Sequence, residues 1–489
     1  MQAFVIPPGV SRVTDTLENA GFEAYIVGGC TRDLLIGRTP KDWDVTTNAK
    51  PEEIQGLFEE TFYNNDFGTV GVVSHETTDE HLKVIEVTPY RTESTYSNAR
   101  HPDAVEFGAS LEEDLKRRDF TVNALAFSPS KGHFVDLYKG QSDIKDKIIR
   151  AVGNPSERFR EDALRMLRAI RLGAELGFSI EQDTFVAIRE NAHLIGKISR
   201  ERVRDEFTKI VLSDRPMEGV FYMKQCGLLP FTIPELEKAV GIEQNHSHQY
   251  PVFEHLLRSL QHAADKKWSL EVRLAALFHD VAKPQTRRFS RETNDYTFYG
   301  HEVVGARETK KILQGLRYPQ KIVEKVVTLV RWHMFFSDPD QITLSAVRRM
   351  ITNVGQENIW ELLDLRICDR IGSGRPKEQP FRFRKYKSMV EEALRDPVSV
   401  SMLKIDGAGI MAVSHETPGP KIGLVLHALL EEVLDDPAKN EAAYLSKRAT
   451  ELLELPFNEL TTLGTQGKAR RGTEEEKEIN KIRSKYGVL

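Results

Sequence analysis

The alternation of apolar and polar positions divides the chain into two regions. In residues 1–150, short runs of β-branched and aromatic residues predict strands, which cover 24–29, 69–74, 82–90 and 120–127. Residues 10–22 and 51–60 have the apolar spacing of helices, and the second of these begins with a proline, which the first turn of a helix accepts. From about residue 155 the pattern is helical almost to the end. We therefore expect an α+β head followed by an all-helical region.

The composition limits the partners that the chain can have. It has 489 residues, enough for about two to four domains, and a net charge of −5. A nucleic acid would have to meet local basic clusters, because the overall charge does not attract it. The three cysteines lie far apart, and no stretch approaches the roughly 18 apolar residues of a membrane span. We expect a cytoplasmic protein with no disulfide framework, zinc knuckle or membrane segment.

A glycine pair and two aspartates follow the first predicted strand. Gly28 and Gly29 allow the backbone to approach a phosphate, and Arg32 lies one turn into the next predicted helix. Asp42 and Asp44 are two residues apart, so in an extended segment their carboxylates point to the same face and suit Mg²⁺. Such metals would align an attacking hydroxyl with an α-phosphate. A lone glycine pair is usually a turn and a lone Asp-x-Asp a solvated pair, but this order of elements resembles the polymerase-β-like nucleotidyltransferases.

Three other stretches supply candidate partners for this carboxylate pair. Glu86 is a candidate third carboxylate, because burying an acid within an apolar strand is costly unless the acid is paired or binds a metal. An edge-strand glutamate that faces water fits the sequence equally well. Arg118 could clamp a phosphate through two hydrogen bonds, and Asp119 and Asn123 could hold a ribose. The triplet at 117–119 is weak evidence alone, since surface ion pairs are common.

Residues 157–178 are predicted to form one helix. Asp162, Arg165 and Arg168 recur every three residues and would form a slanted stripe on it, with Arg171 beyond them. An aspartate can accept from the amino group of cytosine or adenine, and an arginine can donate to a ring nitrogen or carbonyl. This stripe could therefore read the edge of an incoming base, whereas Glu161 and Arg165 could be no more than a helix salt bridge.

In this order, the motifs GGCTRD…DWD, RRDFTVNALAF and EDALRMLRAIR resemble those of the class II tRNA nucleotidyltransferase and poly(A) polymerase family. The resemblance implies a head, neck, body and tail, and tRNA, CTP and ATP as partners. It implies that Asp42 and Asp44 hold Mg²⁺, and that Asp162 and Arg165 act as a protein template. It further implies that the triphosphate contacts Gly29, Arg32 and Arg118, and that Arg168 and Arg171 line the nucleotide site.

The run at 91–108 resembles the flexible loop of this family, which moves to switch selection from C to A. Members that add only the two C residues lack most of this loop. A basic-aromatic segment usual in bacterial poly(A) polymerases is absent after the metal motif. We therefore expect full CCA addition, with A-addition alone or poly(A) synthesis as alternatives.

A second metal site is predicted in the helical region. His279 and Asp280 are adjacent at the end of one predicted helix, with Lys283 three residues on. His255 lies upstream on another predicted helix, and His301, His333 and Asp369 follow. Histidines and carboxylates that face one pocket suit a divalent metal such as Mg, Mn, Ni or Co, although a lone histidine is more often a core residue. The set resembles the HD-type metal-dependent phosphohydrolases. Whether it would hydrolyse phosphate from damaged tRNA ends, 2′,3′-cyclic phosphates or nothing stays open.

These features predict four parts: a nucleotidyltransferase head at 1–150, a neck and RNA-binding body at 151–240, an HD-type helical domain at 241–395 and a helical tail at 396–489. No stable protein partner is implied. Two other classes of function compete with the polymerase: a phosphohydrolase with a vestigial head, and a non-catalytic RNA-binding protein. The intact set of acidic residues in the head favours the polymerase.

Overall fold

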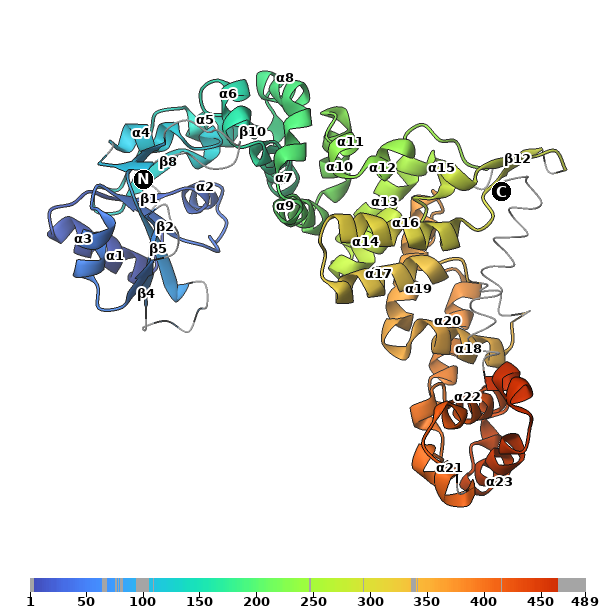
Figure 1. Ribbon diagram of the computed structural model, residues 1–489. Helices are drawn as coiled ribbons and strands as arrows, with labels where there is room; N and C mark the ends of the chain where they lie inside the picture. The colour runs from blue at the N-terminus through green and yellow to red at the C-terminus, as the bar shows by residue number, and fades with distance from the viewer. Residues whose placement is uncertain are drawn as a thin grey trace. The chain divides into compact units, whose positions relative to one another are not determined.

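The structure, a computed structural model, has two compact units, Met1–Pro234 and Glu235–Leu489. It describes residues 4–63, 68–74, 77, 79, 82–93, 105–108, 110–245, 248–292, 294–335, 340, 342–414 and 416–464. Each unit has its own buried core, and Figure 1 gives the element labels.

The first unit begins with a mixed sheet. Within the described residues its strand order is β3-β4-β5-β2-β1-β8-β9. The bounds are β1 Ala24–Val27, β2 Asp44–Thr47, β3 Thr61–Tyr63, β4 Val70–Val73, β5 Val84–Pro89, β8 Leu125–Ser128 and β9 His133–Asp136. The only parallel pair among them is β2 with β5; β1 lies antiparallel to β2 and to β8. A separate hairpin joins β6 (Arg91–Glu93) to β7 (Val105–Phe107).

The two faces of this sheet have different roles. On one face, Ile26, Val45 and Ile85 pack with residues of α1 (Pro8–Asn19) and α3 (Pro51–Leu57), which lie together beside the sheet in Figure 1. On the other face a smaller cluster contains Val27 and Leu115. Because successive strand residues point to opposite sides, Asp44 and its register partners Val27 and Glu86 point to this second face. The α1–α3 side is therefore the core, and the second face is free to carry polar chemistry.

One predicted strand of the head is wrong in its first half. The run at 120–127 was expected to be extended throughout, but Thr121–Asn123 form a 3-10 turn, and β8 begins only at Leu125. The turn is fixed by α5 (Gly140–Asp146), because the Thr121 hydroxyl donates to Asp143 at 2.6 Å. A Cβ on Gly140 would lie 2.3 Å from the Thr121 carbonyl oxygen, so only glycine permits this close approach.

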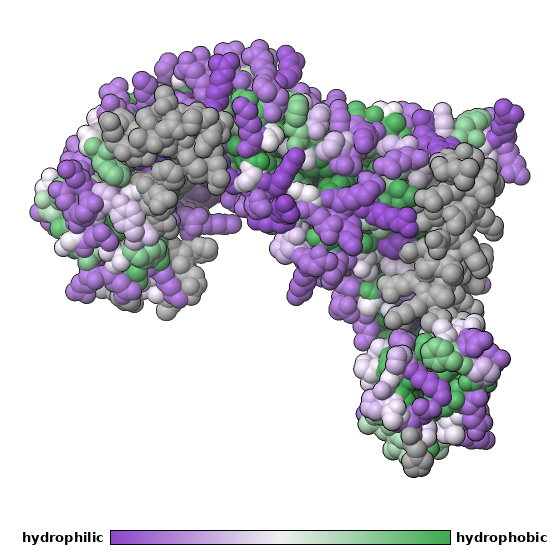
Figure 2. Space-filling view, viewed as in Figure 1, coloured by the Kyte–Doolittle hydropathy of each residue, from purple (hydrophilic) through white to green (hydrophobic). Residues whose placement is uncertain are grey.

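Within the described residues, helices and a two-stranded parallel sheet of β10 (Ile148–Ile149) and β11 (Ser179–Ile180) make up the rest of the first unit. The bounds of the helices are α2 Gly29–Leu35, α4 Leu111–Lys116, α6 Pro155–Glu161, α7 Leu164–Leu176, α8 Gln182–Asn191, α9 Arg200–Leu212, α10 Pro216–Gln225 and α11 Leu229–Thr232, with α12 Pro234–Lys238 at the boundary. Helix α7 packs against α9 and α10, and the surface over α6 and α8 is mostly hydrophilic (Figure 2).

The expected single helix at 157–178 is wrong, because it consists of α6 and α7 with a break at Asp162. Asp162 has extended backbone angles of φ −138° and ψ 106°. Its side chain accepts a hydrogen bond from the backbone N–H of Leu164 at 3.0 Å, in the manner of a helix cap. Asp162 therefore lies ahead of α7, and the stripe predicted from Asp162 to Arg168 does not share one helix.

Among its described residues, the second unit is helical apart from a short hairpin of β12 (Arg288–Ser290) and β13 (Asp295–Thr297). Its helices are α13 Val252–Asp265, α14 Leu270–Phe278, α15 Lys283–Thr286, α16 His301–Gly315, α17 Gln320–Trp332, α18 Leu344–Val354, α19 Ile359–Gly372, α20 Phe381–Ala393, α21 Gly407–Ser414, α22 Pro420–Asp435 and α23 Ala442–Leu453. The most extensive helix contacts of this unit are those of α13 with α19 and of α16 with α17, while α14 contacts α13, α17 and α19. In the described part of the chain, no helix combines the length and apolar character needed to cross a membrane.

Candidate functional sites

The glycine after β1 brings an acid and a base together. Gly28 has φ +83°, and helix α2 begins at the next residue. A Cβ on Gly28 would lie 3.2 Å from Oδ2 of Asp44 and 3.3 Å from Nη1 of Arg118. Glycine is therefore required both for the backbone angle and for the space. The carboxylate of Asp44 and the guanidinium of Arg118 meet beside the start of α2.

Asp44 is surrounded by other carboxylates. It pairs in register with Glu86 on β5, while Asp42 is exposed in a bend before β2. Burial, together with Glu86 and Asp42, raises the pKa of Asp44 to about 6 against the opposing effect of Arg118. The extended segment expected to hold both aspartates is wrong for Asp42, because β2 begins only at Asp44. Acids that repel one another, two of them on one face of a sheet, still fit a divalent cation.

Glu86 lies on the Asp44 face of the sheet, and its side chain is exposed. The edge position in the alternative for Glu86 is wrong, since β5 lies between β4 and β2, but the exposed side chain agrees with its other part, a glutamate that faces water. Its role as a third carboxylate stays a prediction.

A chain of hydrogen bonds links α2 to α7. Nη1 of Arg32 donates to Oδ1 of Asn123 at 2.7 Å, and Nδ2 of Asn123 donates to Oδ1 of Asp119 at 3.1 Å. Nε and Nη2 of Arg168 both donate to Oδ2 of Asp119, at 2.8 and 2.6 Å. Burial alone would raise the pKa of Asp119, but Arg168 holds it well below its usual range. Both oxygens of Asp119 thus have partners within the protein, and the ribose role predicted for Asp119 and Asn123 stays a prediction.

The residues expected to read the base lie at the start of α7. Oδ2 of Asp162 accepts from Nη2 of Arg202 on α9 at 2.8 Å. Nη1 of Arg165 donates to Glu161 at 2.7 Å, so the predicted salt bridge exists, although it spans the break between the helices. Nη2 of Arg165 donates to the carbonyl of Arg117 at 3.0 Å. The guanidinium is therefore held by α6 and by the turn that carries Arg118.

Helix α9 adds two charged residues that the sequence analysis did not single out. Arg202 contacts Asp162, and Glu206 accepts from Nη1 of Arg171 at 3.4 Å. Their spacing of four residues on one helix was the available signal, because it places them on the same face. Each orients one of the predicted nucleotide-site residues.

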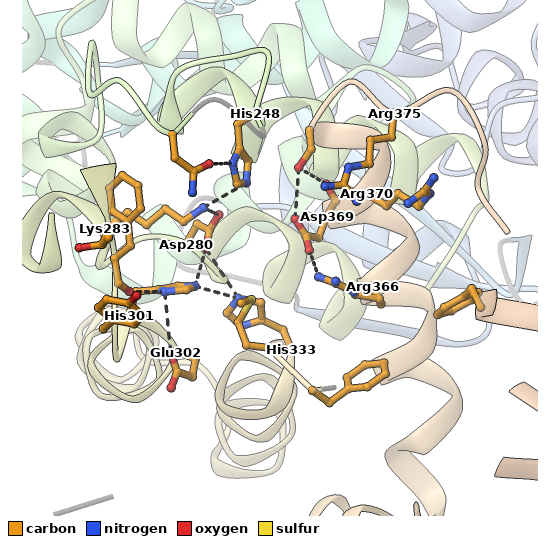
Figure 3. Close-up of a pocket in the computed structure, with 18 of the residues that line it drawn as sticks. His248, Asp280, Lys283, His301, Glu302, His333, Arg366, Asp369, Arg370 and Arg375 are labelled. Carbon is orange, nitrogen blue, oxygen red and sulfur yellow. Dashed lines mark hydrogen bonds and ion pairs between the residues drawn. The ribbon is translucent and has the colours of Figure 1, made fainter. Parts of the chain in front are cut away.

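The predicted metal ligands of the second unit lie in one buried cluster. His255 comes from α13, His279 and Asp280 follow α14, and Asp369 comes from α19. His301 begins α16 and His333 follows α17. The atoms divide into two groups, each within 4.8 Å: His255, His279 and Asp369, and Asp280, His301 and His333. Asp280 spans the groups, because its Oδ2 lies 3.1 Å from Nε2 of His255 and its Oδ1 lies 3.2 Å from Nε2 of His301 (Figure 3).

The protonation of the histidines fits metal ligands. Nδ1 of His279, His301 and His333 lies 2.9, 2.6 and 2.7 Å from a backbone carbonyl oxygen. A carbonyl only accepts, so Nδ1 carries a proton in all three, and in the neutral rings of His301 and His333 Nε2 presents a lone pair. Against the effect of burial, Asp280 and Asp369 raise the pKa of His279 to about 9, so a metal there would displace a proton from its Nε2. Nε2 of His301 nevertheless lies 3.3 Å from Nε2 of His333. Two lone pairs this close repel, and a cation between them removes the repulsion.

Asp280 fits the same interpretation. Nζ of Lys283 lies 2.6 Å from its Oδ2, while Oδ1 forms no hydrogen bond within the described residues. Burial alone would raise the pKa of Asp280, but Lys283 and His279 hold it well below its usual range. A buried ionised carboxylate with one unused oxygen facing two histidines is a suitable metal ligand.

Two predicted segments lie partly or wholly outside the described residues. Of the expected loop at 91–108, the structure describes the hairpin of β6 and β7 and Gly108, whereas 94–104 fall outside. The helical tail predicted at 396–489 is described as far as residue 464, so 465–489 also fall outside.

Comparison with family models agrees with this geometry. Residues 24–150 match the poly(A) polymerase head domain, 177–240 match the probable RNA- and SrmB-binding site of polymerase A, and 252–371 match the HD domain. The fold and the acidic site therefore define a nucleotidyltransferase head joined to helical RNA-binding and HD regions. Such head and HD domains imply dependence on divalent metals.

Individual relatives narrow this class to one family. A CCA-adding enzyme of Levilactobacillus brevis is 31% identical over 449 residues, which cover 90% of this chain and 96% of the relative. The chain belongs to the family of CCA-adding enzymes. The relative from Ligilactobacillus salivarius is 50% identical over 209 residues, which cover 42% of the chain and only half of the relative. The crystal structure of the Bacillus stearothermophilus CCA-adding enzyme in complex with CTP aligns with a TM-score of 0.69 at 27% identity, covering 91% of this chain and 98% of that one.

Proposed function

We propose that the chain adds CCA to the 3′ end of tRNA from CTP and ATP without a nucleic-acid template. The observation that carries this proposal is the meeting of Asp44 and Arg118 beside Gly28, at the start of α2, with Glu86 opposite Asp44 on β5. Arg32 on the same helix begins the chain of hydrogen bonds to α7. Family membership, together with relatives whose structures are described as complexes with CTP, ATP and tRNA, supports the choice of substrates. A role in tRNA processing and three buried, unpaired cysteines suit a cytoplasmic location.

In this reaction the 3′-hydroxyl oxygen of tRNA forms a bond to the α-phosphorus, and the bond to the leaving pyrophosphate breaks. Asp42 and Asp44 would hold Mg²⁺, with Glu86 beside them. When bound, Mg²⁺ supplies alignment and neutralises charge on the phosphates. Gly28 and Gly29 let the triphosphate approach the backbone, and further residues of the head, Arg32 and Arg118, contact it. The chain of hydrogen bonds through Asn123 and Asp119 connects Arg32 on α2 to Arg168 on α7 and fixes both side chains.

Base selection falls to Asp162 and Arg165. The break before α7 frees Asp162 from helical geometry, and Arg202 fixes its orientation. Glu161 and the Arg117 carbonyl fix Arg165 in the same way. A carboxylate acceptor and a guanidinium donor, three residues apart at the start of α7, are the groups that complement the edge of cytosine or adenine. Arg168 and Arg171 would line the nucleotide site, and the loop at 91–108 would switch selection from C to A.

The test uses three tRNA substrates, ending at the discriminator base, at CC and at CCA, each incubated with one NTP at a time. The proposal expects CTP incorporation on the first, a single A on the second, and none on the third. Growth of the CC end alone would replace it with A-addition. Unlimited A tails on any end would replace it with poly(A) synthesis.

We propose a second activity, metal-dependent phosphohydrolysis, at the cluster in the second unit. The opposed Nε2 atoms of His301 and His333 favour this activity. Burying two polar nitrogens against each other costs free energy in a packed core, and a bound cation offsets that cost. With Asp280 between two groups, the cluster can hold two cations. Imidazole-rich ligation favours a transition metal such as Mn, Ni or Co over Mg.

Metal analysis of the purified chain tests this second site. We expect about two equivalents of Mn, Ni or Co per chain, and about one in His333→Ala. His193→Ala is the control, since His193 is not among the metal-site groups in the described residues. Metal-dependent release of phosphate from p-nitrophenyl phosphate should be lost in Asp280→Asn. Persistence of hydrolysis in Asp280→Asn would contradict the site.

A further inference from the structure

The pocket over the metal cluster extends to a group of arginines. It has a volume of about 1160 Å³, and Asp280, His301 and His333 line it together with Arg366, Arg370 and Arg375. We call these three arginines the arginine wall. Figure 3 shows Arg370 and Arg375 on the far side of Asp369 from Asp280 and His301. The pocket therefore has a metal end and a cationic end, with Asp369 between them.

The arginine wall is built by one helix and its end. Arg366 and Arg370 lie four residues apart on α19, on the same face. Arg375 follows the helix beyond Gly374, whose φ of +83° turns the chain. Two like charges at this helical spacing are mutually destabilising, so their position needs a compensating partner.

The protein neutralises only part of this charge. Arg366 pairs with Asp369, and Nε of Arg370 donates to the backbone carbonyl of Lys377. Neither Arg370 nor Arg375 forms an ion pair with an acid within the described ranges, and Arg375 is exposed. Guanidinium groups in a pocket bind phosphate through paired hydrogen bonds. The wall thus has the chemistry of an anion site.

We propose that this pocket takes a nucleotide substrate with two phosphate groups, one that reacts at the metal cluster and a second that the arginine wall binds. This inference rests on the phosphohydrolase activity proposed above. The reacting phosphate belongs beside Asp280 and Lys283, so a single phosphate there does not satisfy Arg370 and Arg375. The second phosphate does not react; it positions the first.

The lining of the pocket also offers surfaces for the base of a nucleotide. Tyr299 and Phe381 line the pocket with 60% and 71% of their surface exposed. Exposed aromatic rings beside arginines are stacking surfaces for bases. Two sources supply the required chemistry: the end of an RNA with a terminal phosphate and its neighbouring phosphodiester, or a free nucleoside bisphosphate.

The experiment compares substrates on the full-length, metal-loaded protein. These are p-nitrophenyl phosphate, adenosine 3′-monophosphate, adenosine 3′,5′-bisphosphate and a short RNA with a 3′-phosphate. We expect kcat/KM for the bisphosphate or the RNA to exceed that for the monophosphate by about tenfold or more. Preference for the RNA identifies an RNA end as the source, and preference for the bisphosphate identifies a free nucleotide. Equal values for one- and two-phosphate substrates overturn the proposal.

Variants assign the effect to the arginine wall. In Arg370→Gln and Arg375→Gln, the ratio of kcat/KM for the bisphosphate to that for p-nitrophenyl phosphate should fall about tenfold. Arg307→Gln is the matched control, because Arg307 is exposed on α16 and does not line the pocket. An unchanged ratio in both wall variants overturns the assignment.

Binding separates this inference from the activity on which it rests. If no substrate is hydrolysed with any of the metals, the phosphohydrolase proposal fails. Calorimetry with the bisphosphate and the monophosphate then still tests the wall. Tighter binding of the bisphosphate that is lost in Arg375→Gln supports a two-phosphate site, and equal binding of both ligands refutes it.

Discussion

Replacing Asp44 by asparagine should stabilise the metal-free head while it abolishes nucleotide addition. Burial and the neighbouring acids raise the pKa of Asp44 from 3.8 to about 6. Each pKa unit corresponds to about 1.4 kcal/mol, so ionised Asp44 costs the folded head up to about 3 kcal/mol at pH 7. Because the side chain is partly exposed, solvent screening reduces this to roughly 1–2 kcal/mol. Asparagine keeps the shape and removes the charge.

The sign of the pH dependence follows from the raised pKa. The folded head binds the Asp44 proton more tightly than the unfolded chain does, so the metal-free wild type should gain stability as the pH falls from 7 through 6 towards 4. This contribution should be missing in Asp44→Asn. Added Mg²⁺ should stabilise the wild type at pH 7 and leave the variant unchanged.

Hydrogen exchange of the amides in β1, β2 and β5 measures this stability in the intact chain, since it reports on the head alone. Asp15→Asn is the control, because Asp15 is an exposed acid on α1 away from the site. It should change neither protection nor activity. Loss of protection in metal-free Asp44→Asn by more than about 1 kcal/mol at pH 7 would refute the reasoning, as would an equal gain in Asp15→Asn.

Three further substitutions test other parts of the site. Asp119→Asn removes the negative charge that pairs with Arg168 and should raise KM for both CTP and ATP about tenfold. An unchanged KM would contradict the role of the hydrogen-bond chain from Arg32 to Arg168. Asp162→Ala and Arg165→Ala should each lower kcat/KM for CTP and ATP by roughly 10- to 100-fold, without weakening tRNA binding in a filter assay; Arg160→Ala, an exposed position on α6, is the control and should match the wild type. Glu86→Gln should lower kcat about tenfold or more if Glu86 serves as the third carboxylate, and a wild-type kcat would leave it an exposed strand residue.

The sequence predicted the elements of the head where apolar alternation is strong. Residues 24–29 and 82–90 contain β1 and β5 because their β-branched positions fill the core face. The pattern could not show the turn at Thr121–Asn123, since it depends on contacts with α5 far along the chain. It also could not show that β5 is internal, which decides the setting of Glu86.

The break at Asp162 arises because its side chain competes with the helical backbone for hydrogen bonds, which the spacing of apolar residues does not record. The helical spacing continues through 157–178, but the Asp162 carboxylate caps α7 and bonds to Arg202. A side chain that caps a helix and meets a third element lies outside what a pattern of spacing records.

For the metal cluster, the sequence predicted the ligands but not their arrangement in space. The ligand types and the His-Asp pair were visible in the sequence, because they are unusual in apolar helices. Their division into two groups that share Asp280 depends on how α13, α14, α16, α17 and α19 pack. The partners of the arginine wall depend on the same packing.

The product of the complete reaction tests the central claim most directly. A tRNA transcript that ends at its discriminator base is incubated with the protein, Mg²⁺ and all four NTPs, and the 3′ ends are sequenced. The account predicts that growth stops after CCA in nearly all molecules, and that Asp42→Ala and Asp44→Ala yield none. Ends that carry only A, tails without a limit, or incorporation of G and U would contradict a protein template for CCA.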